Sequence, residues 1–331
     1  MSSKKYVVLG AGGSFGIHTC KYLLKNANPK KVIGVGRNIL RPEPFSLSIE
    51  KENNFEYWTR HITHEQDLLL EQLDQEKPEV IINYAAQGEG AVSWKNSWRF
   101  FETNSMALAK FCEELMKRKY LERFIQIGTS EMYGSVDHAV TENEPIKPSS
   151  PYAASKVAFD MHLLSVSKFL DFPMNIIRPS NAYCSGQLLH RVIPKSIVFG
   201  LTKRKLPLQG GGKAEKSFIH ALDLARAIHL VSENAPLGKI YNVGPKEPTS
   251  IKKVVELCAE ALDMKFEDIC EMAPERLGQD SRYWLDSSAI KSDVGWEPEI
   301  GWEEGLKEVT LWAKKYLDYL SKYSTDYIMR A

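Results

Sequence analysis

A glycine-rich turn that joins an apolar run to a helical pattern stands near the start of the chain and constrains its fold more than any other feature. A Tyr-Val-Val-Leu run leads into Gly-Ala-Gly-Gly-Ser-Phe-Gly at positions 10–16, after which apolar residues recur at helical spacing. Strand, turn and helix in this order are typical of a dinucleotide-binding unit. Gly10 permits the tight turn, Gly13 lets the backbone approach a pyrophosphate, and Gly16 allows close packing of helix and strand. The N–H groups that begin the helix would bind the phosphates.

Apolar runs and helical patterns alternate through the next half of the chain. The runs cover residues 31–36, 80–84, 124–127 and 174–177, and the clearest helical patterns cover residues 98–117 and 153–170. Strands that alternate with helices predict a parallel, doubly wound α/β sheet of the Rossmann type. A chain of 331 residues is long enough for this unit and for a smaller, interleaved α/β substrate domain.

The end of the second predicted strand bears on which dinucleotide is bound. An acidic residue there would bind the ribose 2′-hydroxyl of NAD, whereas an arginine would accommodate the 2′-phosphate of NADP. The sequence has Arg37 and Asn38 after a glycine, with Arg41 close behind and no acidic residue. We therefore predict NADP as the cofactor, bound by Ser14, Phe15, Arg37 and Asn38 together with the glycines, and keep NAD as the alternative. An ordinary solvated arginine is the other interpretation of this loop.

Composition excludes several classes of function. The 43 basic and 42 acidic residues give a net charge of +1, which argues against a nucleic-acid binder or a membrane-surface protein. No apolar run has the length of a membrane span and no secretory segment precedes the first strand, so a cytoplasmic location is expected. The five cysteines are scattered without metal-ligand spacing, so we expect reduced, buried thiols and no metal.

Two short segments carry candidate catalytic side chains. Tyr152 and Lys156 lie four residues apart in a helical pattern, which puts them on one helix face. A lysine ammonium beside a phenol lowers the pKa of the phenol, so Tyr152 could accept a proton while hydride leaves the same carbon. Thr129, just after the strand at 124–127, would position the reacting oxygen. Chance spacing is the alternative, and the glycine-rich turn upstream weighs against it.

These segments resemble the extended short-chain dehydrogenase/reductase superfamily over nearly the whole chain. The matching pieces are the turn at 10–16, Asn-Tyr-Ala-Ala-Gln at 83–87, Thr-Ser-Glu-Met-Tyr-Gly at 129–134, Tyr-Ala-Ala-Ser-Lys at 152–156, Arg-Pro-Ser-Asn at 178–181 and Gly-Trp-Glu-Pro at 295–298. Within the superfamily, the chain is similar to the nucleotide-sugar 4,6-dehydratases. The 129–134 segment looks like the GDP-mannose branch, whereas residues 276–284 look more like the dTDP-glucose branch. The resemblance also implies that Ala85, Ala86, Tyr152 and Lys156 contact the cofactor and that Gln87 contacts the substrate.

Glu131 favours a dehydratase within this superfamily. Epimerases and 4-ketoreductases usually have a small or hydroxyl residue at this position, because they need hydride transfer only. In the implied reaction Tyr152 takes the O4 proton, and the 4-ketone acidifies the hydrogen at C5. Glu131, with Ser130 as a relay, removes that proton while the C6 hydroxyl leaves as water, and hydride returns to C6. The alternatives are a loop carboxylate without a catalytic role, an NDP-sugar epimerase or 4-ketoreductase, and a non-catalytic NADP-sensing protein.

The resemblance also divides the chain into two interleaved domains. Residues 1–179 and 220–248 would form the NADP-binding domain, and residues 180–219 and 249–331 the sugar-nucleotide domain. Cationic side chains of the second domain would bind the diphosphate, because arginine pairs with phosphate in a bidentate manner. With Gln87, the substrate-binding candidates are Asn181, Arg191, Lys216 and Arg276. Neither the nucleotide nor the hexose is identified by the sequence.

Two further predictions concern helical surfaces. Family members dimerise through two helices per subunit, which here would be residues 98–117 and 153–170, so a homodimer is expected. The apolar positions that permit this packing are Phe101, Leu108, Phe111, Leu163 and Leu164. Near the end of the chain, helical spacing predicts a packing face formed by Trp312, Tyr316, Tyr319, Tyr323 and Tyr327.

Overall fold

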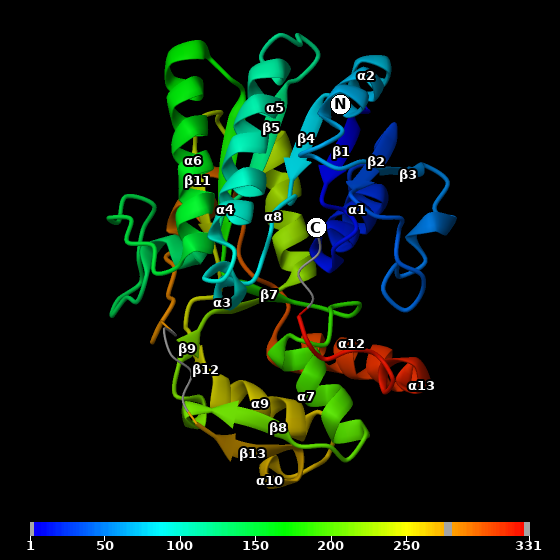
Figure 1. The fold of residues 1–331 in the computed structure, drawn as a ribbon, viewed down its shortest axis with the longest axis vertical. Helices are drawn as coiled ribbons and strands as arrows, with labels where there is room; N and C mark the ends of the chain where they lie inside the picture. The colour runs from blue at the N-terminus through cyan, green and yellow to red at the C-terminus, as the bar shows by residue number, and fades with distance from the viewer. Residues whose placement is uncertain (1–2, 275–279, 328–331) are drawn as a thin grey trace.

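The computed structural model describes residues 3–274 and 280–327, which form a large upper lobe and a smaller lower lobe (Figure 1). Within these residues, the sheet of the large lobe consists of β1 (Lys5–Leu9), β2 (Lys31–Gly36), β3 (Phe55–Thr59), β4 (Val80–Asn83), β5 (Arg123–Ile127), β6 (Met174–Pro179) and β11 (Ile240–Val243). Their order is β11-β6-β5-β4-β1-β2-β3, and every neighbouring pair is parallel. The predicted doubly wound α/β fold is therefore confirmed.

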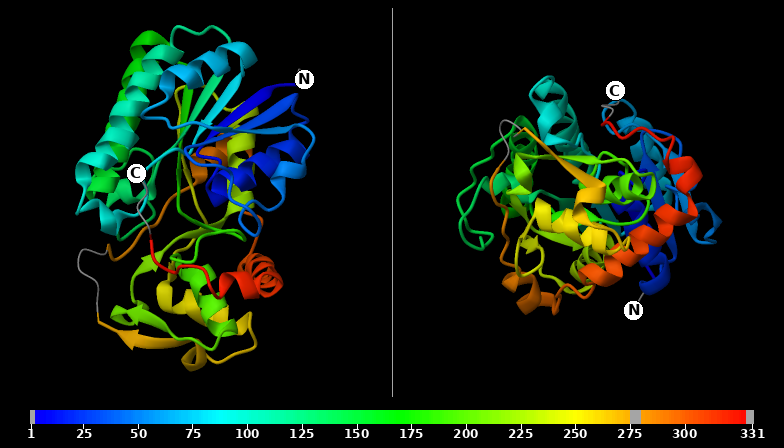
Figure 2. Two further views of the ribbon diagram at one scale, coloured as in Figure 1. Left: turned by 45° about the vertical axis from the view of Figure 1, so that its right-hand side comes forward. Right: turned by 90° about the horizontal axis from the view of Figure 1, so that it is seen from below.

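Helices cover both faces of this sheet, which Figure 2 shows from the side. One face carries α2 (Gln66–Glu76), α4 (Ser97–Phe101), α5 (Leu108–Leu115) and α6 (Pro151–Leu170), and the other carries α1 (Ser14–Asn26), α8 (Ala221–Asn234) and α11 (Ser288–Val294). Alternate strand residues face opposite clusters, so Val7 packs with residues of α2, α5 and α6, whereas Val8 packs with residues of α1 and α8. Burial on both faces explains why the strands are continuous apolar runs.

The helix predicted at 98–117 is not uniform. The π-helical segment η2 (Glu102–Ala107) joins α4 to α5, and α5 ends at Leu115. The apolar residues predicted to form the dimer interface differ in their burial. Leu108, Phe111 and Leu163 are fully buried in the core beside the sheet and are not surface residues, whereas Phe101 is exposed. The exposed apolar side chains on and beside these helices are Trp94, Trp98, Phe101, Met106, Met161, Phe169 and Leu170.

The smaller lobe has its own apolar cluster, built on α7 (Val192–Leu201), α9 (Ile251–Glu260) and α12 (Trp302–Lys315). Its shorter elements are β8 (Leu206–Gln209), η4 (Gly210–Gly212), β9 (Glu215–Lys216), β12 (Thr249–Ser250), α10 (Phe266–Ile269), β13 (Cys270–Ala273) and α13 (Leu317–Leu320). Between the lobes, β7 (Asn181–Tyr183) pairs in parallel with β10 (Phe218–His220). The helical spacing predicted for the C-terminal aromatic residues ends with α13, because residues 321–327 are not helical.

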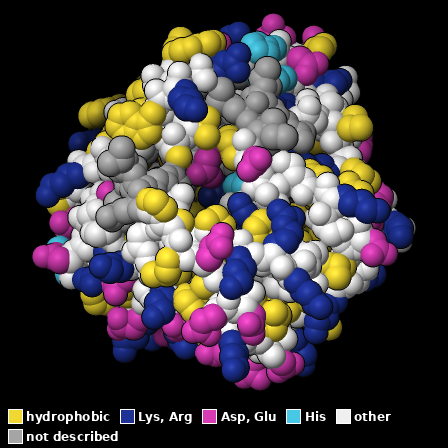
Figure 3. Space-filling view, turned by 60° about the horizontal axis from the view of Figure 1, so that its bottom comes forward, with side chains coloured by type: hydrophobic (Ala, Val, Ile, Leu, Met, Phe, Trp, Pro, Cys, Tyr) yellow, Lys and Arg dark blue, Asp and Glu magenta, His cyan; other side chains and the backbone are white. Residues whose placement is uncertain are grey.

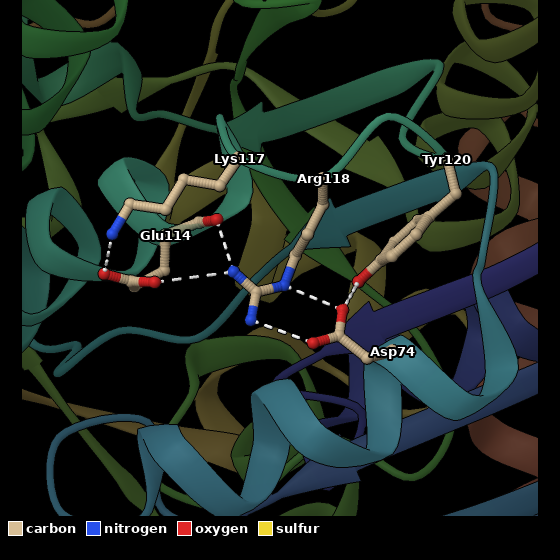
Figure 4. A network of polar contacts seen from close by, with 5 residues as sticks. All are labelled: Asp74, Glu114, Lys117, Arg118 and Tyr120. Atoms are coloured by element: carbon tan, nitrogen blue, oxygen red, sulfur yellow. Dashed lines mark hydrogen bonds and ion pairs between the residues drawn. The ribbon is translucent and has the colours of Figure 1, made fainter.

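A polar network joins α2 to the segment that follows α5 (Figure 4). Arg118 donates from Nε and Nη2 to the two carboxylate oxygens of Asp74, at 2.8 and 3.0 Å. Tyr120 donates to the same carboxylate at 2.9 Å, and Lys117 donates to Glu114 at 2.7 Å. Hydrogen bonds from Arg118 and Tyr120 lower the pKa of Asp74. The bidentate pair connects α2 to the turn that follows α5 on one face of the sheet.

The described surface carries mixed charge. Acidic and basic side chains alternate over the face in Figure 3, which is hollowed near its centre. None of the helices in the described ranges has the length and apolar character needed to cross a membrane. All five cysteines are buried and free, as predicted. Among residues 3–274 and 280–327, no cluster of His, Cys, Asp and Glu could hold a metal ion.

Candidate active site

A cavity of about 350 Å³ opens where β1, β2 and β4 end. Ligands of open parallel sheets bind at this edge. The cavity lining includes Gly10, Gly13, Ser14, Phe15, Gly16, Arg37, Asn38, Ala85 and Ala86, which were all predicted as cofactor contacts. Residues from distant parts of the chain also line it and were not predicted there: Gln187, Leu188, His190, Arg191 and Tyr327. The turn after β1 is thus one wall of this cavity.

The glycine-rich turn has the geometry of an anion cradle. Gly10 has a φ of +82°, and a Cβ there would lie 2.7 Å from the backbone nitrogen of Ala85. A Cβ on Gly16 would lie 2.7 Å from Ala11 Cα, so helix and strand could not pack as they do. Gly13 caps α1, and no side chain accepts a hydrogen bond at this cap. The first N–H groups of α1 therefore face the cavity, and the cradle fits a pyrophosphate.

The rim beside the end of β2 is cationic. Arg37, Asn38 and Arg41 line the cavity, and Arg41 Nη1 donates to the carbonyl of Gly12 at 2.8 Å. Tyr57 donates to the carbonyl of Asn38 at 2.9 Å, which holds this loop against β3. In the part of the chain that the structure describes, neither an aspartate nor a glutamate lines the cavity. The rim therefore suits an anionic group, as the sequence predicted.

Thr129 and Tyr152 meet at the end of β5. Thr129 caps the 3₁₀ helix η3 (Ser130–Tyr133) and accepts a hydrogen bond from the backbone of Glu131 at 3.2 Å. Tyr152 stands in the first turn of α6, whose start is fixed by Pro151 and by the cap of Ser150. The Thr129 hydroxyl lies close enough to the Tyr152 phenol to oppose the rise of its pKa. The two residues predicted to handle the reacting oxygen are therefore brought together.

Lys156 lies on the same helix as Tyr152 but forms its hydrogen bond with β5. Its ammonium is buried and donates to the carbonyl of Ile127 at 2.6 Å. Desolvation lowers the pKa of Lys156 to about 8, although Asp160, buried one turn along α6, opposes this shift. Burial, and then the charge of Glu131, raise the pKa of Tyr152. The predicted lowering of the Tyr152 pKa is therefore wrong, because burial first, and then the nearby carboxylate of Glu131, disfavour the phenolate.

Asn104, which the sequence analysis missed, connects the cavity to the catalytic helix. Its side chain accepts from the backbone N–H of Gln87 at 2.7 Å and donates to the Gln87 carbonyl at 3.0 Å. It also donates to Ser155 Oγ at 3.0 Å. Ser155 in turn donates to the carbonyl of Tyr152 at 2.7 Å. Asn104 is buried and lies in the π-helical segment. The periodicity of apolar residues in the sequence does not predict such a segment.

Glu131 is enclosed among charged groups. Desolvation raises the pKa of Glu131 to about 6, whereas the charges of Arg191 and Lys216 lower it and those of Glu89 and Asp280 raise it. Arg191 Nη1 lies 3.3 Å from Glu89 Oε2, which joins the segment before α7 to the loop after β4. Two cations predicted to bind a diphosphate thus lie within electrostatic reach of the predicted base. Ser130, beside it, is buried at the start of η3.

The remaining substrate-binding candidates are distributed around this cluster. Lys216 Nζ donates to the carbonyl of Asp280 at 2.7 Å and lies 3.4 Å from the centre of the Tyr283 ring. Asn181 begins β7, where its backbone N–H donates to the carbonyl of Ser217 at 3.0 Å. Gln87 is buried and is held through its backbone by Asn104. Arg276, also predicted, lies outside the described residues.

Comparisons with known proteins identify the family of this chain and several of its relatives. Residues 6–244 match the model of the NAD dependent epimerase/dehydratase family. The chain is 28% identical over 329 residues to the dTDP-D-glucose 4,6-dehydratase of Mus musculus, covering 95% of this chain and 89% of that protein. It is 27% identical over 314 residues to a trifunctional UDP-glucose 4,6-dehydratase, epimerase and reductase of Arabidopsis thaliana. That match covers 93% of this chain and 47% of the plant protein, so this chain spans about half of its length.

A solved structure extends the likeness to the fold. The dTDP-glucose 4,6-dehydratase of Bacillus anthracis, in complex with NAD, superimposes with a TM-score of 0.86 at 27% identity. The superposition covers 96% of this chain and 99% of that chain. The dinucleotide named there is NAD, and the matched family is named for NAD as well, so the comparisons do not support NADP over NAD.

Proposed function

Because this chain belongs to the NAD dependent epimerase/dehydratase family, we propose that it is a nucleotide-sugar 4,6-dehydratase, which removes water from an NDP-hexose to form an NDP-4-keto-6-deoxyhexose. The observation that carries the proposal is an enclosed carboxylate, Glu131, beside the Thr129–Tyr152 pair, with its pKa raised to about 6. A base of this pKa is ionised at neutral pH and accepts a proton readily. Hydride transfer alone needs no second acid–base group, so Glu131 favours dehydration.

The cavity fits a nicotinamide dinucleotide, which would supply the hydride acceptor and donor of the reaction. The cradle at Gly10, Gly13 and Gly16 would hold its pyrophosphate. Arg37 and Arg41 on the rim favour NADP, because arginine can bind its 2′-phosphate. The names of the family and of the solved relative favour NAD. We propose NADP on the strength of the rim. Chromatography of the dinucleotide released from purified protein tests this choice, and NAD alone in the released fraction would overturn it.

Tyr152 would accept the proton of the sugar O4 as that alcohol becomes a ketone. Its raised pKa keeps the phenol neutral beforehand, so Tyr152 must first give its own proton to solvent, and the phenolate then takes the O4 proton while the hydroxyl of Thr129 would hold O4 in place. Lys156 has a pKa of about 8, so it is mostly charged at neutral pH. From the same face of α6, its charge would favour the phenolate that the reaction needs.

Glu131 would act in the elimination. The 4-ketone acidifies the hydrogen at C5, and the carboxylate of Glu131 would take that proton while the C6 hydroxyl leaves as water. Ser130, buried beside Glu131, would relay a proton to the leaving hydroxyl. Arg191 and Lys216 offset part of the cost of keeping Glu131 charged, so the base is ionised when substrate arrives.

The smaller lobe would bind the nucleotide diphosphate. We assign residues 180–219 and 249–331 to this role and the rest of the chain to dinucleotide binding. Lys216 and Arg191 would pair with the phosphates, Asn181 would contact them from β7, and Gln87 would face the sugar. The relatives act on dTDP-glucose and UDP-glucose, which are the substrates to test first.

A homodimer is proposed from the helical surface of the large lobe. Trp98, Phe101 and Met106 on α4 and η2, with Met161 on α6, leave apolar area exposed. Pairing these helices with a second copy would bury it. Sedimentation velocity of wild type and of Trp98→Glu tests the interface. A dimer that becomes a monomer is expected, and a wild-type monomer would overturn it.

The test of the reaction is the mass of the product. Purified protein is incubated with each nucleotide sugar, and a product lighter by one water is expected with wild type but not with Glu131→Gln or Tyr152→Phe. The alternative reaction, epimerisation or 4-keto reduction, uses Tyr152 without Glu131. A product of unchanged mass (epimerisation) or one heavier by two hydrogens (4-keto reduction) that Glu131→Gln still forms would favour that alternative and overturn the dehydratase.

A further inference from the structure

The end of the chain returns to the dinucleotide cavity. After α13 the chain runs back toward the larger lobe (Figure 1). Tyr327 lines the cavity. The Tyr327 hydroxyl donates to the carbonyl of Gly88 at 2.9 Å, just after the alanines that follow β4. Its ring meets the ring of His190 edge-on, with centroids 5.2 Å apart. Gly88 and His190 line the same cavity, so three distant segments meet at this point.

The same segment and the helices before it are also fixed to the loop that follows β2. Tyr323 packs against Phe45, with ring centroids 4.7 Å apart, and Tyr319 packs against both rings at 6.2 and 5.9 Å. Trp312 Nε1 donates to the carbonyl of Pro44 at 3.1 Å. Phe45 and Pro44 follow directly on the loop of Arg41, which forms the cationic rim. The C-terminal segment therefore joins the rim to Gly88.

We infer that residues 321–327 form a strap that retains the bound dinucleotide, and that Tyr327 is one of its binding residues. The inference rests on the proposed function only in taking a dinucleotide as the occupant of the cavity. A dinucleotide in the cavity would contact Tyr327. Its release would therefore require the hydrogen bond between Tyr327 and Gly88 to break. Arg37 and Arg191 lie within electrostatic reach of the Tyr327 phenol, which places the strap against the cationic parts of the wall.

The rate of dinucleotide release tests the strap. Protein loaded with NADP or NAD, whichever co-purifies, is diluted into an excess of the same dinucleotide carrying an isotopic label, and exchange is followed by mass spectrometry. Tyr327→Phe removes one hydrogen bond and should speed release about fivefold, whereas Tyr327→Ala also removes the ring and should speed it about tenfold or more. Tyr120→Phe is the matched control, because it removes one 2.9 Å hydrogen bond, to Asp74, at a site that does not line the cavity.

The outcomes separate the strap from the proposed reaction. Release from Tyr327→Ala at the wild-type rate, with an unchanged unfolding midpoint, would overturn the strap. Faster release from the Tyr327 variants supports it, even when no sugar is dehydrated, because exchange requires no turnover. A wild-type protein that binds no dinucleotide would overturn both the strap and the proposed function.

Discussion

Replacing Glu131 by glutamine should make the protein more stable at neutral and alkaline pH, although it removes the proposed base. Desolvation raises the pKa of Glu131 from 4.5 to about 6, despite the opposing charges of Arg191 and Lys216. The ionised carboxylate is therefore less favourable in the folded protein than in the unfolded chain. Glutamine has nearly the same shape and carries no charge, so it avoids the cost of burying one.

The expected gain follows from the size of the shift. The difference between about 6 and 4.5 is about 1.5 pKa units, or about 2 kcal/mol, and partial exposure of Glu131 makes this an upper limit. Between these two pH values the folded protein binds more protons than the unfolded chain, so wild-type stability falls as pH rises through this window. Above a pH of about 6 the full cost of burying the ionised Glu131 carboxylate is present, and below a pH of 4.5 none of that cost remains. The variant should exceed wild type by up to about 2 kcal/mol at high pH and match it at low pH.

Urea unfolding of dinucleotide-free protein on both sides of this pH window measures the effect. Glu71→Gln, a substitution of an exposed glutamate on α2, serves as the matched control and should leave stability nearly unchanged. A Glu131→Gln protein that is no more stable than wild type at high pH would refute the reasoning, because Glu131 would then not be desolvated.

Three other substitutions test separate parts of the structure. Gly16→Ala puts a Cβ 2.7 Å from Ala11 Cα, so α1 must shift, and we expect about 1–3 kcal/mol of destabilisation by thermal unfolding and weaker dinucleotide binding. Asp160→Asn removes the charge that raises the pKa of Lys156, so the alkaline limit of kcat/KM should move to lower pH; an unchanged pH profile would contradict this. Arg118→Ala removes the bidentate pair with Asp74 and should cost about 1 kcal/mol in urea unfolding without changing kcat; a fall in kcat would show that this network reaches the site.

Local features of the chain were predictable from the sequence. Three features follow from short spacings or from the edge at which parallel strands end. They are the turn at Gly10, the alternation of strands and helices along the chain, and the proximity of Tyr152 to Thr129. These features are specified by neighbours in sequence. The structure therefore places the predicted cofactor residues of the turn after β1 and of the loops after β2 and β4 around one cavity, whereas Tyr152 and Lys156 do not line it.

Features that depend on distant residues were not predictable. The pKa of Tyr152 is set by burial and by Glu131 more than by Lys156, whose ammonium binds a carbonyl of β5. Asn104 lies in a π-helical segment and contacts Gln87, which is 17 positions earlier. Tyr327 meets a residue 239 positions earlier, a contact that no periodicity of the C-terminal segment encodes.

The central claim is that Glu131 turns hydride chemistry into dehydration, and NMR of the reaction in D₂O tests it most directly. Wild-type protein is incubated with dTDP-glucose, UDP-glucose and GDP-mannose, and the Glu131→Gln variant with whichever sugar reacts. The account predicts a 4-keto-6-deoxy sugar that carries solvent deuterium at C5, formed without net consumption of dinucleotide and absent with the variant. An epimerised or oxidised sugar that retains its C6 hydroxyl, formed equally by wild type and variant, would contradict it.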